Sequence, residues 1–344
     1  MFFRHSFISG ICVLGLVVFS MEAAAAKFPI PGNDTGVIGE ISTVRATYDD
    51  TLLDIARRNG VGYQQIKMSN PGVDVWLPGE GQVVTIPRRF LLPHARREGI
   101  VLNIPEMRLY YYPQRSSGQA TEVYSFPLGI GREGWSTPYI KTSVIRKHKD
   151  PYWHPPESIK KEHAEKGDPL PDRVAPGPDN PLGKYALRLG LPQYLIHGTN
   201  KPSGVGMRVS HGCIRLYPED IELLYSMVNT GTPVNIINQP YKVGLHNNEI
   251  FLEAHPYLDE DTPLFRDNLT SVVSILIDIT GDRRYEVDWD LAKQVIRELD
   301  GNPVRIGRVF DETRTQVSLV PAGEPVIGTE FELRLDMNLS AGKK

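Results

Sequence analysis

The sequence predicts a chain of three folded parts, of which the largest, residues 97–237, is mostly β. Short runs that alternate between apolar and polar residues, separated by Pro, Gly and Asn, predict the strands of this part. The whole chain of 344 residues holds 31 glycines and 28 prolines, which favours a loop-rich β protein over a helical bundle. A small β-α-α-β unit at 41–88 precedes the β part, and an α+β appendage at 238–344 follows it.

The first residues have the pattern of a cleavable secretory signal peptide. Arg4 and His5 give a basic start, residues 7–19 are apolar, and the alanines at 23–26 fit a cleavage site. The apolar run is too short to cross ~30 Å of hydrocarbon comfortably, which disfavours the alternative of a membrane anchor. We therefore expect residues 1–26 to be removed and the mature, exported chain to have no transmembrane segment.

After a linker rich in Pro and Gly at 28–39, the region 41–88 predicts a compact β-α-α-β unit. Its expected elements are an extended piece at 41–46, helices at 51–58 and 63–68, and a strand at 82–86. Thr51 and Asp54 have capping-box spacing, and Gly60 ends the first helix. The unit resembles a LysM module, whose family binds the glycan of peptidoglycan or chitin. The alternative is a small structural cap on the next part.

The central part, 97–237, combines candidate strands with one clear helix and one long insertion. The strands are expected at 99–104, 107–112, 122–130, 142–147, 185–189 and 193–197. Pro218 opens the helix, whose apolar residues share a face, and Gly231 ends it. The polar insertion at 150–183 contains eight prolines. Insertions of this length in compact domains are usually functional, which suggests a lid, with disorder as the alternative.

The C-terminal part, 238–344, predicts a smaller α+β fold without a catalytic constellation. The apolar run 272–279 predicts a buried strand. A helical stripe follows, which Gly301 closes; it consists of Trp289, Ala292, Val295, Ile296 and Leu299. Residues 239–344 carry 12 Lys and Arg against 19 Asp and Glu, and the whole chain has a net charge of −3. This balance argues against nucleic acid as a partner.

The chemistry is concentrated around Cys213, the only cysteine left once Cys12 is removed with the signal peptide. His197 and the run Ser210, His211, Gly212 lie near it in sequence. A thiol is a weak nucleophile at its ordinary pKa, and a nearby imidazole can take its proton. Two other interpretations are open: a zinc site of Cys213, His211 and His197, or a buried, inert cysteine. Nothing spaced like a metal motif supports zinc, so no metal or cofactor is expected.

The motif of His197 followed by Ser210-His211-Gly212-Cys213-x-Arg215 resembles the signature of the YkuD-type L,D-transpeptidases of bacterial cell walls. The resemblance covers about 140 residues, and the LysM-like unit in front is similar to the arrangement in periplasmic proteobacterial members. It implies a β-sandwich or barrel with one or two helices, and a location in the periplasm. It also implies a reaction in which Cys213 attacks the bond between meso-diaminopimelate and the terminal D-alanine of a tetrapeptide stem.

The resemblance also implies roles for the residues of the site. His197 is the general base, Ser210 and His211 hold the geometry, and N–H groups near Gly212 and Cys213 bind the oxyanion. The expected substrate-binding residues are Arg215, which stands where many members carry Asn, together with Arg132, Tyr194, Arg208 and Asn200.

The expected partners are peptidoglycan stem peptides and glycan, with three candidate acceptors for the acyl group: a second stem peptide, the lysine of an outer-membrane lipoprotein, or water. The alternatives to a transpeptidase are a cell-wall cysteine peptidase or L,D-carboxypeptidase, and a non-catalytic LysM wall-binding protein.

Overall fold

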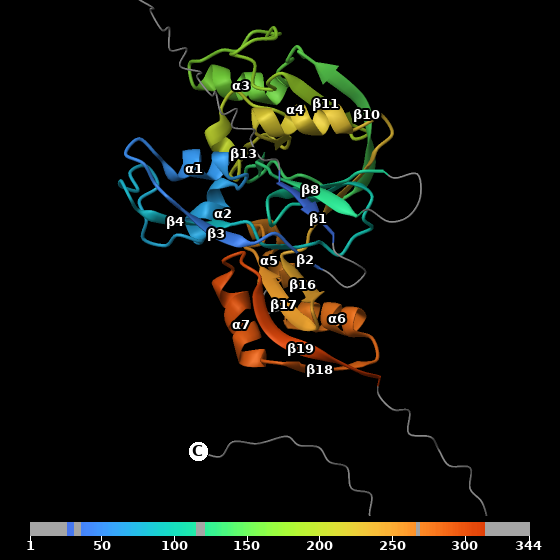
Figure 1. Cartoon of the computed structure of the whole chain (residues 1–344). Coiled ribbons are helices and arrows are strands. Elements are labelled where there is room, and N and C mark those ends of the chain that lie inside the picture. Colours follow the sequence, from blue (N-terminus) through green and yellow to red (C-terminus); the bar gives the residue numbers. More distant parts are fainter. Residues whose placement is uncertain (1–25, 31–35, 115–120, 266–268, 314–344) are drawn as a thin grey trace, which may run out of the picture.

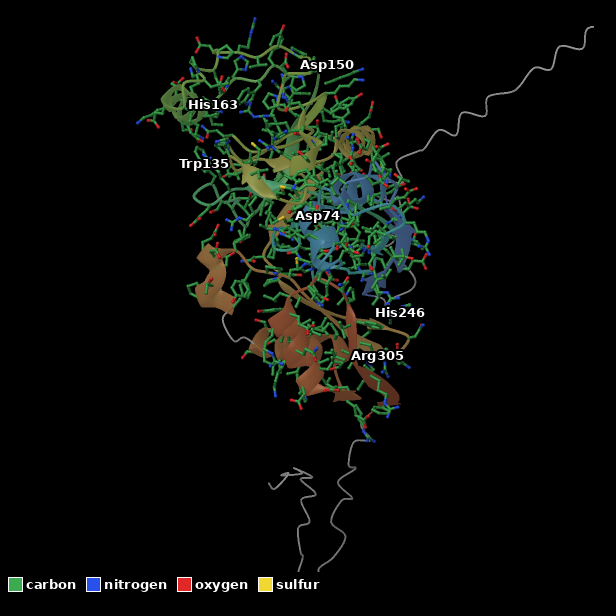
Figure 2. The ribbon with its side chains drawn as sticks, turned by 90° about the vertical axis from the view of Figure 1, so that its left-hand side faces the viewer. Asp74, Trp135, Asp150, His163, His246 and Arg305 are labelled. Carbon is green, nitrogen blue, oxygen red and sulfur yellow. The ribbon has the colours of Figure 1, made fainter. Side chains whose placement is uncertain are left out.

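The computed structural model describes residues 26–30, 36–114, 121–265 and 269–313. Figure 1 shows the C-terminal part at the bottom, the large sheet above it and the blue β-α-α-β unit against its side. In Figure 2, Asp150 and His163 mark the insertion at the top, and His246 and Arg305 mark the C-terminal part. Apart from Ala26, the predicted signal peptide lies outside the described residues.

The β-α-α-β unit has the elements that the sequence predicts. They are β3 (Ile41–Arg45), α1 (Leu52–Arg58), α2 (Tyr63–Met68) and β4 (Val83–Pro87). Thr51 caps α1: its side chain accepts from the Asp54 N–H at 3.1 Å, and the Asp54 carboxylate accepts from the Thr51 N–H at 3.1 Å. The core of the unit is fully buried and includes Leu52, Ile55, Ile66, Val84 and Ile86, whereas Leu53 is only half-buried.

The central part is built on a nine-stranded sheet, which confirms the mostly β fold class. In spatial order the strands are β1 (Ala26–Pro29), β8 (Glu122–Pro127), β7 (Arg108–Tyr112), β6 (Gly99–Asn103), β15 (Pro233–Ile237), β10 (Lys141–Lys149), β11 (Tyr185–Leu189), β12 (Leu195–His197) and β14 (Ile214–Arg215). Two short strands, β9 (Ile130–Gly131) and β13 (Arg208–Ser210), pair beside it. Helix α4 (Pro218–Met227) packs on β11 and buries Ile221 and Leu224 in the main core.

Part of the region expected to be a linker is instead strand. β1 pairs with β8 at the edge of the large sheet, and β2 (Val37–Ile38) pairs with β5 (Phe90–Leu91). Phe28 of β1 lies edge-on to Phe90, with ring centroids 6.0 Å apart. The side chains of β1, β2 and β5 pack on one face of β6 and β7, and the main core packs on the other. Both faces of β6 and β7 are therefore buried along their whole length.

The C-terminal part is a four-stranded sheet with helices packed on it. Its strands, in spatial order, are β16 (Tyr241–His246), β17 (Glu249–Ala254), β19 (Val304–Thr313) and β18 (Arg283–Val287), and its helices are α5 (Thr262–Phe265), α6 (Leu269–Thr280) and α7 (Trp289–Glu298). The helix predicted from Trp289 is confirmed. It begins after Asp288, whose carboxylate accepts from the Leu291 N–H at 3.0 Å.

The strand predicted at 272–279 is wrong, because this segment belongs to helix α6. Val272, Leu276 and Thr280 are buried at four-residue intervals, which is the spacing of one helix face. Ile277, by contrast, is 54% exposed. A run that is apolar at nearly every position carries little periodicity, so it does not distinguish a strand from a helix.

The β-α-α-β unit is docked firmly on the central part. The Tyr63 and Gln64 N–H groups donate to the carbonyls of Val205 and Gly206, at 3.2 and 3.3 Å. Gly206 has φ +83°, and a Cβ there would lie 2.2 Å from the Tyr63 nitrogen, so only glycine allows this approach. The fully buried Arg108 adds a hydrogen bond from Nη1 to the Gln65 side chain at 2.8 Å.

A buried ionic cluster joins the central and C-terminal parts. Lys242 Nζ lies 2.8 Å from a Glu106 oxygen and 2.7 Å from a Glu253 oxygen, and all three side chains are fully buried. Glu253 also accepts from the His255 ring at 2.5 Å and from the Leu91 N–H at 2.5 Å. One ammonium thus compensates two buried carboxylates that come from different parts of the chain. No helix among the described residues is long and apolar enough to cross a membrane.

We expect Lys242→Met to destabilise the fold by about 3–5 kcal/mol, because it leaves two carboxylates buried without a counter-charge. The measurement is the free energy of unfolding in urea. Lys293→Met is the matched control, since Lys293 pairs with Asp290 at the surface and the loss should stay within about 0.5 kcal/mol. Equal stabilities of the two variants would contradict the assigned role of the cluster.

Candidate active site

Two short parallel strands place the central residues of the site on one face of the large sheet. The register of β12 and β14 pairs Ile196 with Ile214 and His197 with Arg215. Both isoleucines are fully buried in the core. Because side chains alternate along a strand, His197 and Arg215 point to the opposite face, as does Cys213, two residues before Arg215. The alternation therefore gathers these three side chains on one side.

Cys213 lies immediately before β14, and its sulfur contacts the loop that precedes β12. It is a free, half-buried thiol whose Sγ lies 3.5 Å from the carbonyl oxygen of Gln193. Burial raises the pKa of the Cys213 thiol, and a backbone hydrogen bond with Leu195 and the charge of Arg215 oppose that rise. At neutral pH the sulfur therefore keeps its proton until a base removes it.

His197 has the protonation state that such a base needs. Its side chain is buried, and its Nδ1 lies 2.6 Å from the carbonyl oxygen of Gly198. A carbonyl only accepts hydrogen bonds, so this contact places the proton of the neutral ring on Nδ1, and the ring also has a backbone hydrogen bond with Leu182. Burial and the charge of Arg215 lower the pKa of His197 to about 3, so the ring is neutral at neutral pH.

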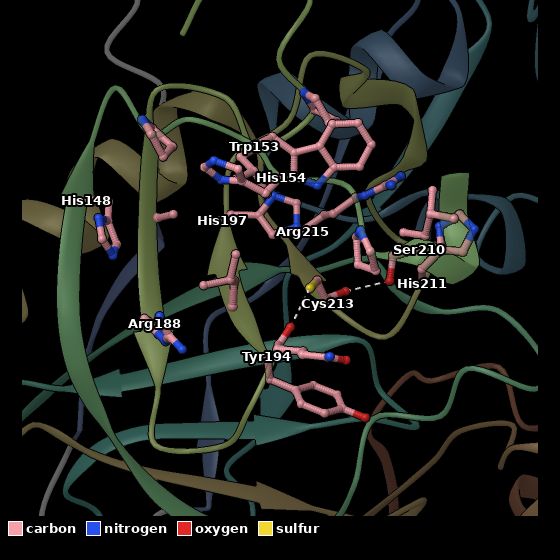
Figure 3. Close-up of a pocket in the computed structure, with 18 of the residues that line it drawn as sticks. His148, Trp153, His154, Arg188, Tyr194, His197, Ser210, His211, Cys213 and Arg215 are labelled. Atoms are coloured by element: carbon pink, nitrogen blue, oxygen red, sulfur yellow. Dashed lines mark hydrogen bonds between the residues drawn. The ribbon is translucent and has the colours of Figure 1, made fainter. Parts of the chain in front are cut away.

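Two hydroxyl side chains hold the backbone around Cys213 by donating hydrogen bonds to the carbonyls of Gly212 and Cys213. Ser210 is buried and donates from Oγ to the Cys213 carbonyl at 2.6 Å, and Thr137 donates to the Gly212 carbonyl at 3.1 Å (Figure 3 draws the first). Gly212 has φ +96°, a conformation that disfavours any other residue. In the described chain neither the Gly212 nor the Cys213 N–H donates a backbone hydrogen bond, so both are available to a ligand.

The insertion at 150–183 is ordered and covers the site. It contains helix α3 (Glu157–Glu165), and Trp153 and Val174 form a two-residue bridge through backbone hydrogen bonds of 3.0 and 2.8 Å. Asn180 is fully buried, and its side chain donates to the Pro151 carbonyl at 2.8 Å. A helix was not expected here, because the segment is polar and rich in proline.

Glu162 of α3 reaches down from the insertion to the motif residues. Its carboxylate lies 3.1 Å from His211 Nε2, forms an ion pair with Arg132, and lies 2.6 Å from Lys166 Nζ. Hydrogen bonds from Arg132, Lys166 and His211 hold the pKa of Glu162 well below its ordinary value. Sequence reasoning missed Glu162, because it lies in no motif.

Insertion and sheet together enclose a cavity of about 560 Å³ that contains the thiol. Figure 3 shows Cys213, His197, Arg215, Ser210 and His211 around it. The walls from the insertion are largely apolar and aromatic, and the sheet adds further cationic groups. The other lining residues include Trp135, His148, Trp153, His154, Ile159, Leu182, Ala186, Arg188, Tyr194 and Leu195.

Comparison with known proteins decides the family. Residues 97–236 match the family model of the L,D-transpeptidase catalytic domain. The chain is 38% identical to the probable L,D-transpeptidase ErfK/SrfK of Escherichia coli (strain K12), over 86% of this chain and 96% of the relative. It is 39% identical to the probable L,D-transpeptidase YcfS of the same strain, over 85% of this chain and 92% of the relative. The chain belongs to the L,D-transpeptidase family.

A solved structure, the catalytic domain of the L,D-transpeptidase of E. faecium, is also similar to this chain. It covers 42% of this chain and 100% of its own, at 21% identity and a TM-score of 0.32. The family assignment rests on the sequence relatives rather than on this overlap.

Of the substrate-binding residues predicted for this L,D-transpeptidase, two line the cavity around Cys213 and three do not. Arg215 and Tyr194 line the cavity, and the Tyr194 hydroxyl donates to the Ser136 carbonyl at 3.1 Å. Arg132 is not among the residues that line the cavity; it pairs with Glu162 and lies near Trp135, which does line it. Arg208 points away toward the C-terminal part and pairs with Glu260 at 3.2 Å, and Asn200 borders a separate hollow of about 280 Å³.

The residues of the zinc interpretation do not meet as a ligand set. Among the described residues, the one group of three whose ligand atoms lie within 4.8 Å of one another is Glu106, Glu253 and His255. Lys242 already supplies the cation there. The groups near Cys213 are thus an imidazole, a guanidinium and backbone N–H groups, a set whose chemistry suits nucleophilic catalysis by a thiolate.

We expect Arg215→Gln to raise the pKa of Cys213 further, because the arginine charge stabilises the thiolate. The measurement is the rate of Cys213 alkylation by iodoacetamide against pH, whose midpoint should move to higher pH in the variant. Arg208→Gln is the control, since that arginine lies outside the cavity. A midpoint that stays fixed or falls in Arg215→Gln would contradict the electrostatic role of Arg215.

Proposed function

We propose that this peptidoglycan L,D-transpeptidase transfers acyl groups through Cys213, with His197 as the general base. The observation that carries the proposal is the hydrogen bond from His197 Nδ1 to the Gly198 carbonyl. It favours the tautomer in which Nε2 carries no proton and can accept one from the thiol, and His197 and Cys213 line the same cavity.

In the first half of the reaction, Cys213 Sγ attacks the carbonyl that joins meso-diaminopimelate to the terminal D-alanine of a tetrapeptide stem. The thiol proton passes to His197, and the oxyanion receives hydrogen bonds from the Gly212 and Cys213 N–H groups. His197 then returns the proton to the leaving nitrogen, D-alanine departs, and a thioester remains on Cys213. Neither ATP nor a metal enters this balance.

In the second half, an amine attacks the thioester, His197 takes its proton and Cys213 is released as a thiol. The acceptors that fit are the amine of a second stem peptide and the lysine of an outer-membrane lipoprotein; water would give a carboxypeptidase. The insertion supports an amine as the acceptor, because its largely apolar and aromatic walls reduce the access of water to the thioester.

The role of Ser210 in this scheme is positional, and Thr137 acts in the same way. Thr137 holds the Gly212 carbonyl, which shares its peptide group with the Cys213 N–H, and so orients one of the two N–H groups assigned to the oxyanion. Ser210 holds the Cys213 carbonyl and thereby fixes the backbone on the other side of the nucleophile. His211 is held by Glu162 and by the edge of the Trp135 ring, with centroids 5.0 Å apart.

The β-α-α-β unit supports a second part of the proposal, that it is a LysM module that binds wall glycan. Three large apolar side chains stand exposed on its two long loops: Tyr48, Trp76 and Leu77 are 80%, 64% and 77% exposed. The Asp74 carboxylate holds one loop by accepting from the Trp76 and Leu77 N–H groups, both at 2.8 Å. Exposed aromatic side chains on a fixed loop suit stacking against sugar rings. Export to the periplasm by the signal peptide 1–26 completes the proposal.

We expect Cys213→Ala to abolish D-alanine release and new amide formation, and His197→Gln to slow both by roughly 10²–10⁴-fold. The assay is mass spectrometry of a disaccharide-tetrapeptide incubated with the enzyme, with and without a lipoprotein C-terminal peptide. A matched control is His246→Gln in the C-terminal part. Turnover by Cys213→Ala close to that of the unmodified enzyme would refute the assignment.

We expect Trp76→Ala to weaken binding to isolated peptidoglycan while leaving kcat and KM for a soluble tetrapeptide donor unchanged. Binding is measured by sedimentation with the insoluble wall. The control is Ile277→Ala, which removes an exposed apolar side chain from α6. Unchanged sedimentation of Trp76→Ala would argue for a structural cap instead of a glycan-binding module.

A further inference from the structure

Helix α3 is tied to the rest of the protein by one carboxylate. It buries a single side chain, Ile159, which lines the cavity. In the described chain, the only side-chain hydrogen bonds that link α3 to residues outside 150–183 are those of Glu162, to Arg132 and His211. Lys166 also contacts Glu162, but it follows directly on α3 within the insertion. The residues outside the insertion that anchor α3 are therefore Arg132 and His211.

The positions of Arg132 and His211 suit the binding of a carboxylate between them. Both lie against Trp135: the His211 ring meets it edge-on at 5.0 Å, and the Arg132 guanidinium lies 6.0 Å from its centroid. The Arg132 N–H donates to the Ser210 carbonyl at 2.9 Å, which fixes its backbone to the turn before Cys213. Guanidinium and imidazole N–H groups that converge on one point suit a carboxylate.

We propose that Arg132 and His211 form the subsite for the terminal carboxylate of the acyl donor, and that Glu162 occupies it in the free enzyme as an internal substitute. The donor expels Glu162 on binding, which releases α3 from this contact. The inference rests on the proposed acyl donor and adds a specificity-determining site to it.

The reach of the donor agrees with this assignment. The terminal carboxylate of a tetrapeptide belongs to the residue whose nitrogen leaves, so it lies within one residue of the carbonyl that Cys213 attacks. His211 and Cys213 line the same cavity, so the imidazole side of the subsite and the sulfur face one enclosed space. A carboxylate at the subsite is thus compatible with the attacked carbonyl at the sulfur.

The test compares Glu162→Gln with the matched control Glu157→Gln on the same helix. Glu157 pairs with Lys160 at the surface, and its side chain is 88% exposed. Two donors are used, a tetrapeptide with a free terminal carboxylate and the same peptide with a terminal carboxamide. We expect Glu162→Gln to lower KM for the carboxylate donor by roughly threefold or more, since it removes a competing ion pair. KM for the carboxamide donor should not change, and Glu157→Gln should match the unmodified enzyme with both donors.

A second variant keeps the test decisive if Glu162→Gln folds poorly. Arg132→Gln should raise KM for the carboxylate donor and leave KM for the carboxamide donor unchanged. An equal effect on both donors, or no effect in either variant, would overturn the subsite. If the unmodified enzyme releases no D-alanine at all, it is the proposed function that fails, and the two failures are thereby distinguished.

Discussion

The site depends on the two-residue parallel pairing of β12 with β14. This register sends Ile196 and Ile214 into the core and sets His197 beside Arg215, with Cys213 on the same face. Burial of the two isoleucines makes a one-residue slip costly, because it would carry every side chain of β14 to the opposite face. The apolar core thus fixes the positions from which the polar side chains of the site make their hydrogen bonds.

Burial sets the chemistry of the base as well as its place. His197 loses solvent and lies beside the Arg215 cation, so its pKa falls to about 3. The same burial raises the pKa of Cys213, which makes a pre-formed thiolate–imidazolium pair unfavourable. Burial thus disfavours the charged form of each group, and the proposed first step begins from a neutral thiol and a neutral imidazole. The negative charge of Glu162 is compensated by hydrogen bonds from Arg132, Lys166 and His211.

Much of the fold could be predicted from local signals in the sequence. Capping residues located α1, helical periodicity located α4 and α7, and alternation located most strands of the large sheet. The run 272–279 failed because it is apolar at nearly every position. Glu162 could not be found, since its partners Arg132 and His211 are distant in sequence and it stands in a polar helix of ordinary composition. Lys242 did leave a signal: a lone cation in an otherwise apolar strand implies buried counter-charges, here Glu106 and Glu253.

The central claim is that Cys213 carries the acyl group between donor and acceptor. The most direct measurement is mass spectrometry of the intact protein, quenched in acid shortly after mixing with a tetrapeptide donor, followed by peptide mapping. The account predicts an adduct of the donor minus D-alanine on Cys213, bound as a thioester and discharged when an amine is added. D-alanine release with an adduct on another residue, or with no adduct while Cys213 can be alkylated throughout turnover, would contradict it.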